Sequence, residues 1–193
     1  MKMKIEKNHS VINGDRIFLR EVELADVNQT YIQWMNDPEV TQYLESRFFP
    51  QSMESISAFV KHQIEDPHVA FLAICLNENK LHIGNIKLGP VDVIHRFADV
   101  GLVVGDKKFW GKGYGNEAIG LVVKYAFQTL NLNKLVANCY QLNKGAIKAF
   151  RKNGFEIEGV WSKHHFCKGK YIDTVLLGIL NPNRNDSDED KID

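Results

Sequence analysis

The sequence has little of several features that would place it in a specialised class. Its 193 residues contain three cysteines, Cys75, Cys139 and Cys167, which form no Cys-x-x-Cys pair, so neither a disulfide framework nor a metal site is expected. The formal net charge of +0 gives no electrostatic basis for nucleic acid as the main partner. No apolar stretch approaches the roughly 18 residues of a membrane span, and the polar start lacks a signal peptide's apolar core. We therefore expect a cytoplasmic protein without a membrane partner.

The apolar patterning predicts a mixed α/β fold. Segments rich in β-formers alternate with segments of helical spacing, and the turn at residues 77–80 joins two of the strands as a hairpin. The sheet is expected to be largely antiparallel, with about seven strands. The predicted strands are 16–22, 69–76, 81–88, 97–104, 134–140, 155–161 and 171–180, and the predicted helices are 24–35, 38–44, 53–65, 114–130 and 143–153. We expect one domain over residues 1–180, followed by an acidic, disordered tail over 181–193.

A glycine-dense turn lies between the strand 97–104 and the longest predicted helix. Gly111, Gly113 and Gly115 are spaced by two residues, and such a turn lets backbone N–H groups approach an anion beside the positive end of a helix. The P-loop is excluded because Asn116 and Glu117 stand where Lys-Ser or Lys-Thr is required. The dinucleotide-binding fingerprint is excluded by the glycine spacing. A turn without a ligand is the alternative that this segment alone leaves open.

The flanking residues make a known family recognisable. The run from Trp110 to Gly115 resembles the acyl-CoA pyrophosphate loop of the GNAT N-acetyltransferase superfamily, Gln/Arg-x-x-Gly-x-Gly/Ala, with Trp110 in the place of Gln or Arg. It is most similar to the RimJ/RimL branch. Three further segments carry the same resemblance, which covers residues 14–180: Gly14 to Arg20, Trp34 to Val40, and Asn143 to Val160. It implies the GNAT fold, in which two central strands splay apart.

The resemblance also implies acetyl-CoA as a co-substrate, held in the gap between the splayed strands. The pantetheine arm would pair with backbone groups of the strand, and the diphosphate would bind amides of the loop. Leu102 and Val104 are also ordinary core residues, and Asn143 is also a good helix N-cap, so structural roles stay open for them. The implied cofactor-binding residues are Leu102, Val103, Val104, Trp110, Gly111, Lys112, Gly113, Tyr114, Gly115, Asn116 and Asn143.

The catalytic groups are harder to assign. Ala146 and Phe150 stand where many relatives carry Ser or Tyr as the acid that protonates the departing thiolate. Tyr140 is the nearest alternative donor, although a tyrosine on a strand can equally be a packing residue. Asp99 is our choice of base, because relatives often carry an acid there; an ordinary solvated carboxylate is the alternative.

The substrate is expected to be the primary amine of a small molecule, with an amino sugar or sugar nucleotide as the first choice. Arg47 could pair with its phosphate or carboxylate, or be an exposed loop cation. His164 and His165 are neighbours on a predicted strand and should point to opposite faces, which argues against a shared metal site. Either could contact the substrate, and His164 is our choice.

Three other functions stay open. They are N-terminal acetylation of a protein, polyamine acetylation, and a non-catalytic acyl-CoA sensor, which the apolar Ala146 and Phe150 would fit. Polyamines are disfavoured because residues 41–56 are not strongly acidic. By resemblance the protein is a monomer or a homodimer.

Overall fold

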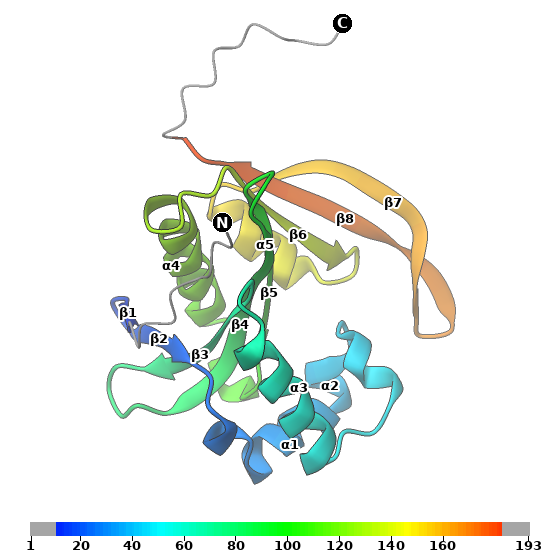
Figure 1. The fold of residues 1–193 in the computed structure, drawn as a ribbon. Helices are drawn as coiled ribbons and strands as arrows, with labels where there is room; N and C mark the ends of the chain where they lie inside the picture. Colours follow the sequence, from blue (N-terminus) through cyan, green and yellow to red (C-terminus); the bar gives the residue numbers. More distant parts are fainter. Residues whose placement is uncertain (1–10, 183–193) are drawn as a thin grey trace, which may run out of the picture.

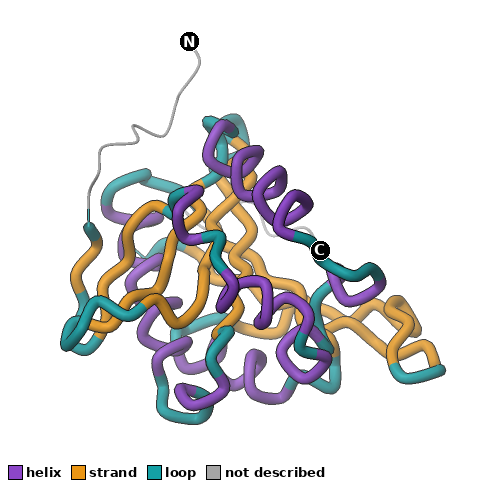
Figure 2. Tube along the Cα trace, turned by 90° about the horizontal axis from the view of Figure 1, so that it is seen from below, coloured by secondary structure: helices purple, strands orange, loops and turns teal. Residues whose placement is uncertain are grey.

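The computed structural model describes residues 11–182, which form one twisted sheet with helices on both of its faces (Figures 1 and 2). The sheet has eight strands in the order β1-β2-β3-β4-β5-β6-β8-β7. All neighbouring strands are antiparallel except β5 and β6. The strands are β1 (Ile12–Asn13), β2 (Ile17–Glu21), β3 (Ala70–Leu76), β4 (His82–Asp92), β5 (Phe97–Val104), β6 (Lys134–Tyr140), β7 (Glu156–Cys167) and β8 (Lys170–Leu180).

Two hydrophobic cores lie on opposite faces of this sheet. On one face, α4 buries Ala118, Ile119 and Val122 against the strands. On the other face, α1 and α3 bury Tyr31 and Val60, among others, over β3. The α-helices are α1 (Gln29–Asn36), α2 (Pro38–Thr41), α3 (Met53–Glu65), α4 (Tyr114–Gln128) and α5 (Lys144–Lys152), and the 3-10 turns are η1 (Leu24–Asp26), η2 (Glu45–Phe48) and η3 (Lys107–Phe109).

The strands β5 and β6 splay apart, as expected. They pair only from Phe97 with Lys134 to Asp99 with Val136, whereas β6 pairs with β8 along its whole length. In a strand, the N–H and C=O groups of successive residues point alternately to the two sides. Because the Gly105 N–H donates to Ile83 O on the β4 side, the backbone groups of Leu102 and Val104 point into the gap toward β6.

Most predicted elements are confirmed, and four of them differ from the prediction. The predicted helix 24–35 is interrupted, because the Asn28 side chain accepts hydrogen bonds from the N–H groups of Thr30 and Tyr31 and starts α1 there. The predicted helix 38–44 ends at Thr41, and η2 follows it. β4 continues to Asp92 through an irregularity after Leu88.

The fourth difference concerns the ends of the sheet. The short β1 brings the strand count to eight, and β7 continues six residues beyond the predicted end at Trp161, to Cys167. The β7–β8 hairpin therefore extends beyond the rest of the sheet (Figure 1).

Within residues 11–182, no helix has the length and apolarity needed to cross a membrane. The predicted tail begins at Asn181, and its residues from 183 onward lie outside the described part of the chain.

Candidate active site

The glycine turn between β5 and α4 has a backbone that its glycines make possible. Gly111 and Gly113 have φ angles of 71° and 88°, in the left-handed region that residues with a Cβ rarely adopt. Gly115 serves a different purpose, because a Cβ there would lie 3.2 Å from Leu102 Cδ1. Two glycines thus shape the turn, and the third lets α4 approach β5 closely.

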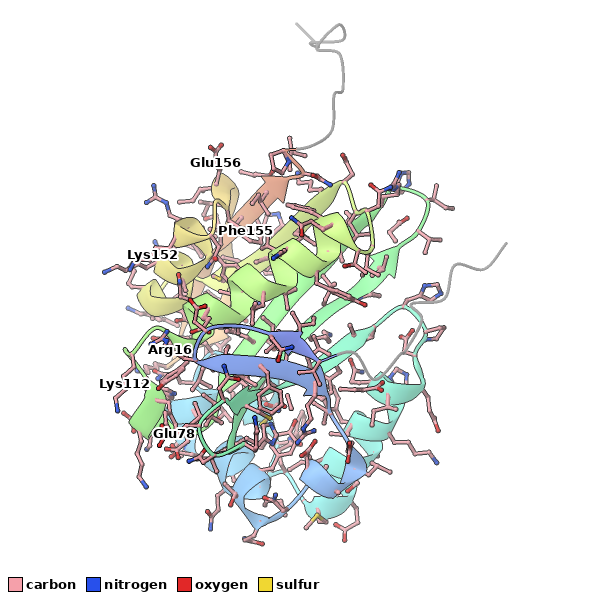
Figure 3. The ribbon with its side chains drawn as sticks, turned by 90° about the vertical axis from the view of Figure 1, so that its left-hand side faces the viewer. Arg16, Glu78, Lys112, Lys152, Phe155 and Glu156 are labelled. Atoms are coloured by element: carbon pink, nitrogen blue, oxygen red, sulfur yellow. The ribbon has the colours of Figure 1, made fainter. Side chains whose placement is uncertain are left out.

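An ion pair between Arg16, which precedes β2, and Glu117 of α4 supports the turn. Glu117 Oε2 accepts from Arg16 Nε at 2.9 Å, and Glu117 Oε1 accepts from the backbone N–H groups of Arg16 and Ile17 at 2.8 and 3.3 Å. Arg16 Nη1 also donates to the backbone carbonyl of Lys112 at 2.9 Å, and Figure 3 shows Arg16 next to Lys112. The loop conformation therefore depends on residues about 100 positions away.

Two groups beside the glycine turn have partners within the protein. Trp110 Nε1 donates to Val104 O at 2.7 Å, so the carbonyl that pantetheine was expected to use already accepts the indole. Lys107 Nζ lies 2.8 Å from Asp37 and 2.7 Å from Glu39. Those two contacts raise the pKa of Lys107 and attach the turn to α2.

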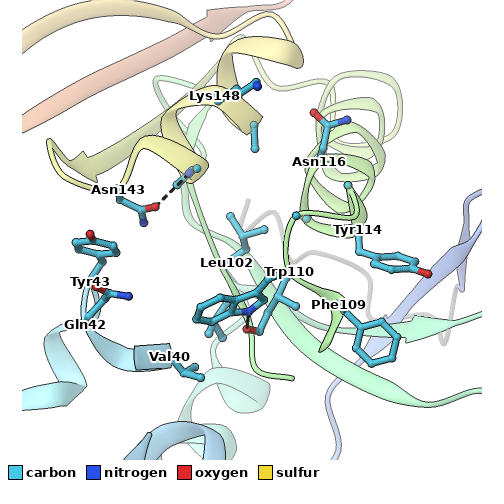
Figure 4. A pocket seen from close by; sticks show the side chains of 18 of the residues that line it. Val40, Gln42, Tyr43, Leu102, Phe109, Trp110, Tyr114, Asn116, Asn143 and Lys148 are labelled. Carbon is cyan, nitrogen blue, oxygen red and sulfur yellow. Dashed lines mark hydrogen bonds between the residues drawn. The ribbon is translucent and has the colours of Figure 1, made fainter. Parts of the chain in front are cut away.

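A cleft of about 550 Å³ opens where β5 and β6 separate (Figure 4). Every predicted cofactor-binding residue borders it except Lys112. The cleft passes from one face of the sheet to the other, since its walls come from α4 and α5 on one side and from the α2 segment on the other. The lining residues that sequence analysis did not assign are Glu39, Val40, Gln42, Tyr43, Leu44, Phe109, Gly145, Lys148, Ala149 and Lys152; Ala146 also borders the cleft.

The two apolar positions noted in the sequence differ in location. Ala146 borders the cleft, whereas Phe150 is 2 % exposed and packs edge-on against Phe155 with ring centroids 5.0 Å apart. Phe150 therefore belongs to the core beneath α5 and offers no proton donor.

Tyr140 is not among the residues that line the cleft, and its hydroxyl has two hydrogen-bond partners. Its hydroxyl donates to Glu45 and accepts from Arg47 Nη1 at 2.9 Å. Burial, and next the hydrogen bond to Glu45, raise the pKa of Tyr140 to about 12. Tyr43, unlike Tyr140, borders the cleft, and its ring lies 5.9 Å from that of Tyr140.

Arg47 connects η2 to the far strands. Its guanidinium donates to the carbonyls of Leu44 at 2.6 Å and Phe166 at 2.7 Å, besides the Tyr140 hydroxyl. Most of its donors are thus used inside the protein, which leaves little for a substrate anion. Arg47 is not an exposed loop cation either, because only 15 % of its side chain is exposed.

Asp99 sits on the splayed strand, on the face away from α4. Its neighbours Ala98 and Val100 are buried in the core beneath α4, so its side chain points to the opposite face of the sheet. Burial raises the pKa of Asp99, and the positive charge of Lys87 opposes that shift. The residue does not border the cleft described above.

The prediction that His164 and His165 point to opposite faces is wrong. Their rings are in edge contact, with centroids 4.8 Å apart. The register jumps from Trp161–Thr174 to His165–Ile172, so β7 uses four steps where β8 uses two and alternation is lost. Among the described residues, no group of three His, Cys, Asp or Glu side chains is placed to hold a metal ion.

Comparison with known proteins agrees with this geometry. A family model described as "Acetyltransferase (GNAT) domain" matches residues 16–156. The chain belongs to the GNAT acetyltransferase family. It is 30% identical over 169 residues to p20 of Bacillus licheniformis, named an uncharacterized N-acetyltransferase, with 86% of this chain and 93% of p20 covered.

Two further relatives differ in their named substrates. The spermidine N(1)-acetyltransferase of Escherichia coli K12 is 27% identical over 162 residues, 84% of each chain. The solved structure of RimL, a ribosomal L7/L12 α-N-protein acetyltransferase in complex with coenzyme A, superposes with a TM-score of 0.78, 18% identity, and coverage of 89% of this chain and 98% of RimL. The last likeness concerns the fold alone.

The cleft of this GNAT acetyltransferase has the donors that a coenzyme A diphosphate needs. Gly111 has open space where a Cβ would stand, so an anion can approach its backbone. Asn143 Oδ1 caps α5 by accepting from Ala146 N at 3.1 Å, while its Nδ2 donates to no described residue. Lys148 and Lys152 add positive charge on the α5 wall. Lys148 and Lys152 are four residues apart, which places them on one face of α5. That spacing is the sequence pattern from which this wall of the cleft could have been predicted.

Proposed function

We propose that this GNAT enzyme transfers the acetyl group of acetyl-CoA directly to the primary amine of a small molecule. The observation that carries the proposal is the cleft through the sheet, which connects the glycine loop on one face with Tyr43 and Leu44 on the other. A donor bound from the α4 side and an amine arriving from the α2 side would meet there. Amides from Gly111 to Asn116 would hold the diphosphate, and Leu102 would pair with the pantetheine arm.

In this reaction a C–N bond forms as the C–S bond of the thioester breaks, and the amine proton must leave. For an amine of pKa near 10.4, deprotonation at pH 7 costs about 4.6 kcal/mol. Asp99 is the proposed base, acting through water, because its raised pKa makes it a better proton acceptor than an ordinary carboxylate. Tyr140 already donates to Glu45, so we assign the thiolate's proton to solvent at the cleft mouth.

The acceptor that we favour is an amino sugar or sugar nucleotide. Polyamines are the second candidate, because the Escherichia coli relative is named for spermidine. Protein N-termini are the third candidate.

The proposal is tested by measuring the release of the coenzyme A thiol from acetyl-CoA with glucosamine, spermidine or an N-terminal peptide as the acceptor. Turnover with either small amine supports it, and turnover with peptides alone contradicts it. Tight coenzyme binding with no transfer to any amine would instead identify a non-catalytic sensor.

A further inference from the structure

The indole of Trp110 lies in the gap between β5 and β6. Its Nε1 donates to Val104 O at 2.7 Å, and that carbonyl points into the gap, because the N–H of the next residue, Gly105, donates to the β4 side. Trp110 and Val104 both border the cleft, and Figure 4 shows the indole reaching into it from the glycine turn. The indole therefore occupies a backbone group with which a ligand in the gap would otherwise pair.

Little besides this hydrogen bond holds the indole in place. Trp110 is 38 % exposed, and within residues 11–182 its ring contacts neither another aromatic ring nor a cation. Trp34, in contrast, is buried and packs against the rings of Tyr31 and His82. Rotation about two side-chain torsions moves the Trp110 indole away without a change in the backbone. Its departure therefore costs one hydrogen bond and no core packing.

The backbone on either side of Trp110 is anchored more firmly than its side chain. Before it, Lys107 Nζ lies 2.8 and 2.7 Å from two carboxylates at the start of α2, and the Trp110 N–H donates to the carbonyl of Lys107 at 3.1 Å. After it, the carbonyl of Lys112 accepts from Arg16 Nη1. The indole is thus a movable group on a fixed frame.

We propose that Trp110 is a gate on the coenzyme site, and that its indole competes with the pantetheine arm for the Val104 carbonyl. This inference rests on the proposed function and deepens its coenzyme side. A carbonyl oxygen can accept two donors, but here both would approach from the same gap, where the indole already lies. The indole must therefore leave before an amide N–H of the arm pairs with Val104. Because one hydrogen bond replaces another, the gate weakens coenzyme binding without blocking it.

Coenzyme binding to the Trp110→Phe variant tests this proposal, because phenylalanine keeps an aromatic ring and lacks the indole N–H. We expect its Kd for coenzyme A, measured by calorimetry, to fall about three- to tenfold, the effect of removing one competing hydrogen bond. The second ligand is the adenosine bisphosphate that forms the nucleotide half of coenzyme A. It lacks the pantetheine arm, so its Kd should stay at the wild-type value.

Trp161→Phe is the matched control. Trp161 lies on β7, is 47 % exposed and does not border the cleft, so both affinities should keep their wild-type values in this variant. Thermal denaturation of both variants shows that each is folded.

The indole N–H of Trp110 reports its own displacement by nuclear magnetic resonance. In isotope-labelled protein its signal is the indole signal that is missing from the Trp110→Phe spectrum. Coenzyme A should move this signal upfield and speed its exchange with water, because the N–H loses its carbonyl acceptor. The adenosine bisphosphate should leave the signal where it is.

The outcomes separate this inference from the function on which it rests. Tighter binding of coenzyme A alone, together with a shifted indole signal, supports the gate. An unchanged or raised Kd in Trp110→Phe, equal gains for coenzyme A and the nucleotide, or an indole signal that coenzyme A does not move overturns it. A wild-type protein that binds coenzyme A but acetylates no amine overturns the proposed function and leaves the gate to be judged by these binding measurements.

Discussion

Removing the Glu117 carboxylate should destabilise the protein and loosen the glycine loop. Its Oε1 accepts two backbone N–H groups, from Arg16 and Ile17, and its Oε2 accepts Arg16 Nε. In Glu117→Ala the N–H of the fully buried Ile17 loses its acceptor, which costs about 1–3 kcal/mol. The ion pair adds only about 0.2–1 kcal/mol, because the Arg16 side chain is half exposed. We therefore expect the free energy of unfolding to fall by about 1–4 kcal/mol.

Urea denaturation measures the loss of stability, and acetyl-CoA titration measures the effect of the loosened glycine loop. A loss of 3 kcal/mol corresponds to a fall in Tm of about 6–12 °C for a chain of this size. The Kd for acetyl-CoA should rise about three- to tenfold, since Arg16 no longer holds the Lys112 carbonyl in place. Glu117→Gln keeps an oxygen for the backbone N–H groups and should lose about 1 kcal/mol or less. Equal stability of Glu117→Ala and wild type would refute the assigned hydrogen bonds.

Three further predictions concern the glycine loop, Asp99 and Asn143. Gly113→Val should fold but bind acetyl-CoA at least about tenfold more weakly by calorimetry. A branched residue rarely adopts a φ of 88°, and its Cβ would lie 3.3 Å from Arg16 Nη2. Unchanged affinity would contradict the assignment of this loop as the diphosphate-binding site. Lys87→Ala removes the charge that opposes the raised pKa of Asp99, so the acidic limb of the pH profile of kcat/KM should move to higher pH. Asp99→Asn should abolish that limb. A limb that does not move in Lys87→Ala excludes Asp99 as the base. Asn143→Ser keeps the N-cap and loses Nδ2, so Tm should stay constant while the KM for acetyl-CoA rises; an unchanged KM would leave Asn143 as a cap alone.

Local patterns in the chain were sufficient for the elements and for the cofactor side of the site. The β5 and β6 boundaries agree with prediction because each is an apolar run with turn residues at its ends. The glycine loop was readable because its requirements are local: Gly111 and Gly113 provide positive φ angles and Gly115 provides close approach. Its spacing excluded the other phosphate-binding loops without any knowledge of distant residues.

Side-chain partners were not readable where they come from distant segments. Arg16 and Glu117 are 101 positions apart, and Tyr140 and Glu45 are 95 apart. No local spacing encodes such pairs, because strand order and register bring them together. The same limit applies to Arg47, whose donors are taken by carbonyls on two elements, and to Trp110, whose indole occupies the Val104 carbonyl.

The sequence alone thus determined the family resemblance, the order of the elements and the position of the glycine loop, since propensity, periodicity and backbone requirements act over a few residues. Only the tertiary structure decided which side chains of β7 lie together. Two extra residues in β7 cancel the alternation that sequence analysis assumed for His164 and His165. A bulge is defined by its pairing with another strand, so β7 acquired it from its register with β8 and not from its own residues.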